Sequence, residues 1–155
     1  MRALISIGTN STRLLIADRS GASWVPVRQV RRGTRLGEGL GPTGQLRPGA
    51  IARTLDAVVA FSHLARSAGA EMRAISTSAM RRAANAGEMI GALESSIGVR
   101  LHVISGQEEA RYSFMGALAG HGNGIAPRAR VGVLDAGGGS TELAVGTTAG
   151  FERAR

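Results

Sequence analysis

The sequence predicts an α/β layer fold, in which helices cover a β-sheet. Short apolar stretches occupy about the first thirty residues, with Gly and Asn at the bends between them. Helical and strand patterns then alternate along the rest of the chain. With 155 residues, the chain can form one ordinary domain, or one small domain and the opening part of a second.

The first elements follow from local sequence signals. Three strands of a meander are expected at residues 2–7, 12–18 and 23–30. Residues 33–49 hold six glycines and two prolines, which indicates a long loop with a turn at 41–44. Pro48 suits the start of a helix, and apolar residues recur at helical spacing from there until Gly69.

Strand and helix patterns continue beyond that first helix. Strands are expected at residues 72–76 and 100–104, and helices at 78–84, 88–96 and 105–119. Asn85 with Glu88, and Ser105 with Glu108, have the spacing of a capping box, in which two side chains satisfy the free N–H groups of a helix start.

The glycine-containing segment 120–127 is the expected domain boundary. Beyond it, residues 131–134 and 142–145 have strand patterns and flank a glycine-rich turn. We therefore expect an N-terminal domain over residues 1–122. The boundary and the opening hairpin of an incomplete second domain would then occupy residues 123–155.

The composition limits the classes of function. The net charge of +8 comes from 19 arginines without any lysine. An anionic partner would be attracted to such a chain, but a genome that favours arginine codons gives the same composition, so charge alone does not choose. Aromatic residues are 3% of the chain, and no basic run is interleaved with them, so we expect no nucleic-acid binding.

Metal chemistry and location are limited as well. The absence of cysteine excludes disulfides and thiolate ligands, and the three histidines lack metal-ligand spacing, so any metal must be bound by oxygen. No apolar run approaches the roughly 20 residues that a membrane span needs. The N-terminal run is too short for a signal peptide, and we therefore expect a soluble cytoplasmic protein without membrane binding.

The two predicted hairpins are similar in sequence. Residues 4–14 align with residues 133–143 without a gap, and both contain an apolar strand, a glycine turn with Ser-Thr, and a second apolar strand. Such a turn can direct backbone N–H groups at phosphate oxygens, and a carboxylate at the strand end can hold Mg²⁺. A single copy is more often an ordinary hairpin, whereas two copies in register, with glycines at 137–139, favour phosphate binding.

Four segments, in order, resemble the exopolyphosphatase / guanosine pentaphosphate phosphatase family. They are Ile-Gly-Thr-Asn-Ser-Thr-Arg-Leu at 7–14, Thr-Ser-Ala-Met-Arg-Arg-Ala-Ala-Asn at 77–85, Val-Ile-Ser-Gly-Gln-Glu-Glu-Ala-Arg at 103–111, and Leu-Asp-Ala-Gly-Gly-Gly-Ser-Thr-Glu-Leu at 134–143. The resemblance implies a ribonuclease-H-like domain of the actin, sugar-kinase and Hsp70 superfamily. It also implies Mg²⁺-dependent hydrolysis of the terminal phosphoanhydride of polyphosphate or guanosine pentaphosphate.

The resemblance also implies a role for individual residues. Glu109 would be the catalytic base that activates the attacking water, and Asp135 and Glu142 would hold the metal. Phosphate would be bound by Thr9, Asn10, Ser11, Arg81, Asn85, Gly138, Gly139 and Ser140. This division of roles suits phosphoryl transfer, which depends on positioning, on cations near the developing charge and on one oriented nucleophile.

Ordinary structural roles compete with these assignments. A glutamate near a helix start is favoured by the helix dipole, so Glu109 taken alone would be structural, and its assignment depends on the motif. Glu108 is assigned to the helix cap. Arg81 and Arg82 could be a solvated pair, and the resemblance gives a function only to Arg81.

The chain departs from the family pattern in two respects. Ser6 stands where the family's first motif has Asp, and the loss of that charge should weaken Mg²⁺ binding. The chain is also too short for the family's second domain, so we expect it to be incomplete as an isolated enzyme. A non-catalytic phosphate or nucleotide binding module, or a degenerate remnant of the family, is the alternative. The unfinished second sheet leaves a homodimer possible, and the sequence does not choose between the two substrates.

Overall fold

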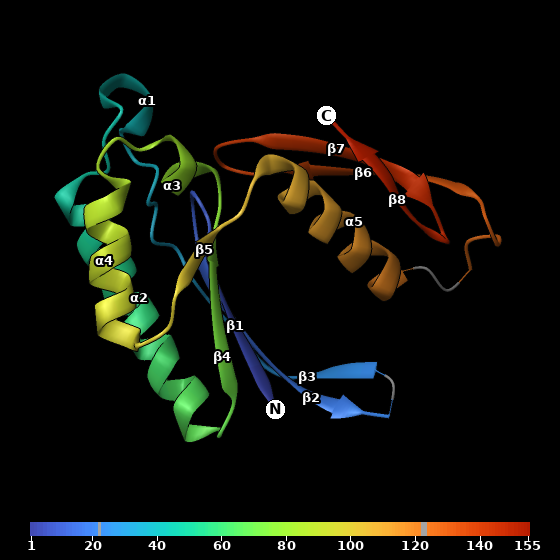
Figure 1. Cartoon of the computed structure of the whole chain (residues 1–155), viewed down its shortest axis with the longest axis horizontal. Helices are drawn as coiled ribbons and strands as arrows, with labels where there is room; N and C mark the ends of the chain where they lie inside the picture. Colours follow the sequence, from blue (N-terminus) through green and yellow to red (C-terminus); the bar gives the residue numbers. More distant parts are fainter. Residues whose placement is uncertain (22, 122–123) are drawn as a thin grey trace. The chain divides into compact units, whose positions relative to one another are not determined.

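The computed structural model describes residues 1–21, 23–121 and 124–155. Its backbone divides into two compact units, Met1–Val103 and Ile104–Arg155, which we call unit 1 and unit 2. Each unit has its own sheet (Figure 1). Within the described residues, no helix is both long and apolar enough to cross a membrane.

Unit 1 is built around a five-stranded sheet. Its strands are β1 (Arg2–Ile7), β2 (Thr12–Ser20), β3 (Ser23–Arg32), β4 (Glu71–Ser76) and β5 (Leu101–Val103). They lie in the order β3-β2-β1-β4-β5. The first three strands form the predicted antiparallel meander, whereas β4 and β5 continue the sheet in parallel with β1. Parallel neighbours require a crossover, and helices supply it here.

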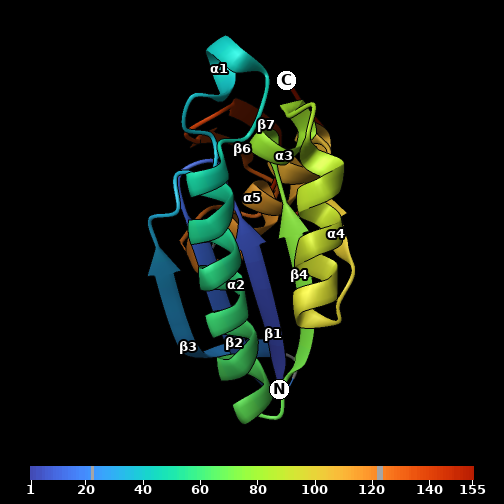
Figure 2. The same cartoon turned by 90° about the vertical axis from the view of Figure 1, so that its left-hand side faces the viewer.

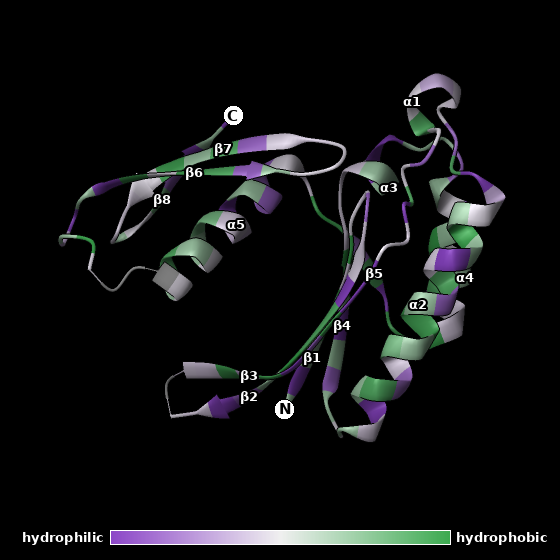
Figure 3. Ribbon diagram, turned by 180° about the vertical axis from the view of Figure 1, so that it is seen from behind, coloured by the Kyte–Doolittle hydropathy of each residue, from purple (hydrophilic) through white to green (hydrophobic). Residues whose placement is uncertain are grey.

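Helices cover one face of this sheet. They are α2 (Pro48–Ser67) and α4 (Ala86–Ile97), which lie side by side over the strands (Figure 2). The short helix α3 (Ser78–Arg82) connects β4 to α4. Hydrophobic residues follow α2, α4 and the central strands (Figure 3). Ile5, Ile7 and Phe61 are completely buried in this layer, and burying each such side chain contributes about 1.5–3 kcal/mol.

The long loop of unit 1 contains one element that the sequence did not predict. A helix of four residues, α1 (Leu40–Thr43), lies between Gly39 and Gly44, both with positive φ. Its sequence, Leu-Gly-Pro-Thr, contains a glycine and a proline, and both have poor helix propensity, so only a loop was expected. The buried side chain of Leu40 holds this turn against the core.

Unit 2 consists of one helix on a three-stranded antiparallel sheet. Its elements are α5 (Gly106–His121), β6 (Arg130–Ala136), β7 (Thr141–Thr147) and β8 (Gly150–Ala154). The Phe114 and Phe151 rings meet edge to face, with centroids 5.9 Å apart. Gly146 lets the helix approach the sheet, since a Cβ there would lie 2.7 Å from the Phe114 ring.

Unit 2 differs from the sequence prediction in one element. The hairpin of β6 and β7 is extended by β8, which the sequence analysis did not predict. The compact units divide between Val103 and Ile104, whereas the domain boundary expected at residues 122 and 123 falls outside the described residues and stays a prediction. The units divide there because α5 packs against β6, β7 and β8, so the helix shares a core with the second sheet.

Candidate functional site

The turn between β1 and β2 is closed by one backbone hydrogen bond. The N–H of Gly8 donates to the carbonyl of Ser11 at 3.0 Å. A Cβ on Gly8 would lie only 3.2 Å from that carbonyl oxygen, which is tighter than most real contacts. The close approach explains why glycine occupies this position.

The turn between β6 and β7 has the same construction. The N–H of Gly137 donates to the carbonyl of Ser140 at 2.9 Å, and a Cβ there would lie 3.1 Å from the same oxygen. The strand registers also agree, because Ser6 pairs with Arg13 as Asp135 pairs with Glu142. The internal similarity of the sequence is therefore a similarity of structure.

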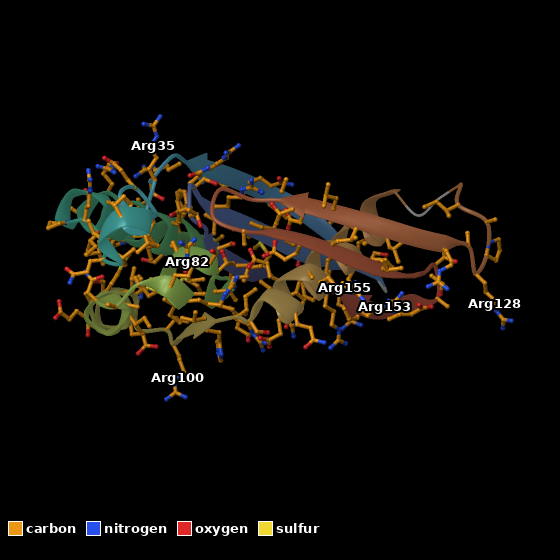
Figure 4. All side chains as sticks on the ribbon, turned by 90° about the horizontal axis from the view of Figure 1, so that it is seen from above. Arg35, Arg82, Arg100, Arg128, Arg153 and Arg155 are labelled. Carbon is orange, nitrogen blue, oxygen red and sulfur yellow. The ribbon has the colours of Figure 1, made fainter. Side chains whose placement is uncertain are left out.

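A loop fixes the first turn from outside. The N–H groups of Gly37 and Arg35 donate to the carbonyls of Thr9 and Asn10 at 3.0 and 3.1 Å. Because loop 33–37 satisfies these carbonyls, the turn is held in one conformation. The Arg35 side chain itself points away from the ribbon (Figure 4).

Three predicted phosphate-binding side chains belong to this first turn. Thr9 is half-buried, Asn10 is exposed and Ser11 is buried. The Ser11 carbonyl already accepts the Gly8 bond, so this residue helps to close the turn through its backbone. The Asn10 side chain is the most accessible of the three.

Asn85 is engaged with the backbone of a distant residue. Its Oδ1 accepts the N–H of Leu46 at 2.8 Å, and its Nδ2 donates to the Leu46 carbonyl at 3.1 Å. Asn85 is the N-cap residue of α4 but makes no side-chain cap, so the capping box predicted with Glu88 is wrong. One amide hydrogen remains after these bonds. Arg81, also predicted to bind phosphate, is half-buried in the last turn of α3.

The predicted metal residues of unit 2 face the helix. Asp135 and Glu142 are directly opposed on β6 and β7, so their side chains lie on the same side of the sheet. Glu142 is buried. Ala144, two residues further along β7, lies on the same face of the sheet and packs against α5. The Ser113 hydroxyl of α5 donates a hydrogen bond to the Asp135 carboxylate.

Glu109 lies in the first turn of the same helix. The predicted capping box before it is confirmed, since Ser105 N–H donates to the Glu108 carboxylate at 2.8 Å and Glu108 N–H donates to the Ser105 hydroxyl at 3.2 Å. Glu109 is half-buried and stands four residues before Ser113, which puts both on one side of the helix. That side meets β6 at Asp135.

These carboxylates can be compared with what Mg²⁺ requires. Among the described residues, no group of three or more His, Cys, Asp or Glu side chains is arranged to hold a metal ion. Mg²⁺ is commonly held by only one or two carboxylates, together with water and substrate phosphates. The opposed Asp135 and Glu142 carboxylates suit this mode in oxygen chemistry and in number.

The remaining predicted residues form the second turn itself. Gly138 is exposed, and Gly139 and Ser140 are half-buried. The three consecutive glycines at 137–139 carry no side chains, so an anion could approach the backbone of the turn closely. This turn directly follows the strand that carries Asp135.

Comparison with known proteins decides the family. The sequence model of the Ppx/GppA phosphatase family matches residues 15–154. The chain belongs to the Ppx/GppA phosphatase family. This membership confirms the resemblance that the four sequence segments indicate.

Relatives extend this result to sequence and structure. Exopolyphosphatase 2 of Mycobacterium tuberculosis is 40% identical over 154 residues, which cover 93% of this chain and 47% of that protein. The Aquifex aeolicus PPX-GPPA enzyme has a TM-score of 0.87 and 30% identity over 99% of this chain and 50% of its own. An exopolyphosphatase from Cytophaga hutchinsonii has a TM-score of 0.89 and 25% identity over 99% of this chain and 48% of its own. The predicted actin-like fold of the family is thereby confirmed, and the chain spans about half the length of these relatives.

Two features of the site were missed by sequence reasoning. The first is Ser113, whose bond to Asp135 joins β6 to the helix that carries Glu109. Its spacing of four residues from Glu109 is a signal that was available in the sequence. The second is loop 33–37, whose contacts with the first turn have no local sequence signature.

Proposed function

We propose that this chain supplies the phosphate-binding and catalytic residues for hydrolysis of the terminal phosphoanhydride of inorganic polyphosphate or guanosine pentaphosphate. The proposal concerns a protein with the full length of the relatives, and it includes Mg²⁺ as the cofactor. The observation that carries it is in unit 2, where opposed Asp135 and Glu142 face the helix that bears Glu109.

Each group has a defined part in the proposed reaction. Glu109 accepts a proton from a water molecule while the oxygen of that water forms a bond to the terminal phosphorus. The bond between that phosphorus and the bridging oxygen breaks, and the shortened chain leaves with the electron pair. Asp135 and Glu142 would hold Mg²⁺, which when bound opposes the negative charge that develops on the oxygens.

Phosphate binding is assigned mainly to the two turns. Backbone N–H groups and hydroxyls at Thr9–Ser11 and Gly138–Ser140 are donors for the oxygens of the substrate. Arg81 adds a guanidinium for bidentate contact. Asn85 can contribute only its remaining amide hydrogen, because its other groups bind the Leu46 backbone.

A non-catalytic phosphate-binding module is the second candidate. Ser6 favours it, since this residue provides no carboxylate at the position that Asp135 occupies in the second hairpin. Such a module would bind polyphosphate and release no orthophosphate from it. A cytoplasmic location and a homodimer stay proposals for either candidate.

The test measures polyphosphate hydrolysis by a fusion protein in which this chain is joined at its C-terminal end to the second half of the M. tuberculosis relative. We expect Glu109→Gln to lower the rate of orthophosphate release from polyphosphate about 10²- to 10⁴-fold in Mg²⁺, as for loss of a general base. Glu88→Gln, an exposed glutamate in the first turn of α4, is the matched control and should leave the rate unchanged. A Glu109→Gln variant as fast as the control would show that the assignment of the base is wrong.

A further inference from the structure

A row of three residues crosses the first sheet beside its glycine turn. Ser6 on β1 pairs with Arg13 on β2, and Arg13 pairs with Arg31 on β3. Opposed residues of antiparallel strands point to the same face, with Cα atoms about 4.5–5.5 Å apart. We call these three residues the Ser6 row. Its face is opposite to that of Ile5 and Ile7, whose side chains are buried in the core beneath the helices.

The charge of the Ser6 row has no counterpart within the fold. Arg13 and Arg31 are both exposed, and neither guanidinium makes a hydrogen bond or ion pair with another residue in the described part of the chain. Like charges directly opposite each other destabilise a sheet. The fold therefore carries two adjacent positive charges that do not contribute to its stability.

The neighbouring row does not neutralise this charge. Two residues along the strands, Leu4, Leu15 and Gln29 are opposed on the same face, and all three are uncharged. Arg73 lies beside Leu4 in that row, and Glu71, further along β4, forms an ion pair with Arg73. Neither of these two rows of the first sheet therefore offers a free carboxylate to Arg13 or Arg31.

The second hairpin has the opposite charge at the equivalent positions. Asp135 stands where Ser6 stands, and Glu142 stands where Arg13 stands. One copy of the repeated hairpin therefore has two carboxylates beside its turn, which suit a cation. The other copy has no carboxylate there, and its Arg13 lies beside Arg31 of the adjacent strand β3, so two guanidinium groups that suit an anion stand together.

We propose that Arg31, together with Arg13, forms a binding subsite for a linear chain of phosphates that needs no metal ion. This inference rests on the proposed function, since it takes the adjacent turn as the place of the chain end. An arginine fork binds phosphate oxygens in pairs, and two forks on neighbouring strands can engage successive phosphate groups of one chain. A single orthophosphate offers only one phosphate group to the two forks, so its binding should depend less on the second arginine.

The experiment measures binding to the 155-residue chain by calorimetry in EDTA. Tripolyphosphate and orthophosphate are the probes. We expect Arg31→Gln to weaken tripolyphosphate binding about tenfold and orthophosphate binding less than about twofold, as for loss of one charged contact. Arg31→Lys keeps the charge without the fork and should weaken tripolyphosphate binding by an intermediate factor.

Arg28→Gln is the matched control. Arg28 is an exposed arginine on the same edge strand, but it pairs with Ile16 and so belongs to the other face of the sheet. The substitution removes the same charge and should weaken tripolyphosphate binding less than about twofold. Circular dichroism of each variant checks that the fold is retained.

Three results would overturn the subsite. They are undetectable binding of tripolyphosphate to the unsubstituted chain, equal weakening by Arg28→Gln and Arg31→Gln, or single-stranded DNA that competes as strongly as tripolyphosphate. A different result would overturn the proposed function and not the subsite. Arg31-dependent binding without any Glu109-dependent hydrolysis would leave the subsite in place and remove the phosphatase reaction.

Discussion

At the scale of single residues, Ser6 distinguishes this chain from its own second hairpin. The turns that follow Ser6 and Asp135 have the same closing hydrogen bond and the same strand register. Their difference is therefore one of charge and not of backbone geometry. A serine hydroxyl can accept a hydrogen bond from metal-bound water, but it has no formal charge to offer the metal.

Restoring the carboxylate tests what this difference costs. In the protein extended by the second half of the M. tuberculosis relative, we expect Ser6→Asp to lower the Mg²⁺ concentration needed for half-maximal activity. The gain of one charged contact is on the order of 1–3 kcal/mol, or about ten- to a hundredfold in metal affinity. Metal-free phosphate binding should not improve, because the new carboxylate faces Arg13 and repels phosphate. If Ser6→Asp leaves the Mg²⁺ dependence unchanged while Asp135→Ser abolishes activity, the metal belongs to the second hairpin alone.

At the scale of elements, Asn85 joins the start of α4 to the loop before α2. The oxygen of its side-chain amide accepts from the N–H of Leu46, and the nitrogen donates to the carbonyl of the same residue, which is buried. A buried backbone group that loses its partner costs about 1–3 kcal/mol. The primary role of Asn85 in this fold is therefore to fix the loop.

Stability measurements can separate this role from phosphate binding. We expect Asn85→Ala to lower the free energy of unfolding by about 1–3 kcal/mol, measured by urea denaturation. Asn10→Ala is the control, since Asn10 is exposed in the first turn and its substitution should change stability by less than about 0.5 kcal/mol. An Asn85→Ala variant that is fully stable but has lost phosphate affinity would contradict the structural role.

At the scale of the whole molecule, the sequence predicts the elements better than their partners. The short apolar stretches, with Gly and Asn at the bends between them, predicted the meander of β1, β2 and β3, because these signals are local. The short strand β8 was missed, since its five residues contain Glu152 and Arg153 and are held by pairing with β7 and by packing against α5, neither of which is a local signal. The capping box at Asn85 failed for a related reason, as a partner 39 residues away takes its side chain.

The candidate site shows the same limit. The repeated turns and the capping box at Ser105 follow from short sequence patterns and were predicted. Three features depend on tertiary structure and were not predicted. They are the bond from Ser113 to Asp135, the loop on the first turn, and the pairing of Arg13 with Arg31.

The central claim is that the two glycine turns bind phosphate and that the second one does so with a metal ion. Backbone amide NMR of the ¹⁵N-labelled chain tests it most directly, because the N–H groups of the turns are themselves the proposed donors. With tripolyphosphate in EDTA, we predict shifts of the amide signals at residues 8–11. After addition of Mg²⁺, the amides at residues 137–140 should shift as well. If tripolyphosphate shifts none of the amide signals at residues 8–11 or 137–140, with or without Mg²⁺, the account is contradicted.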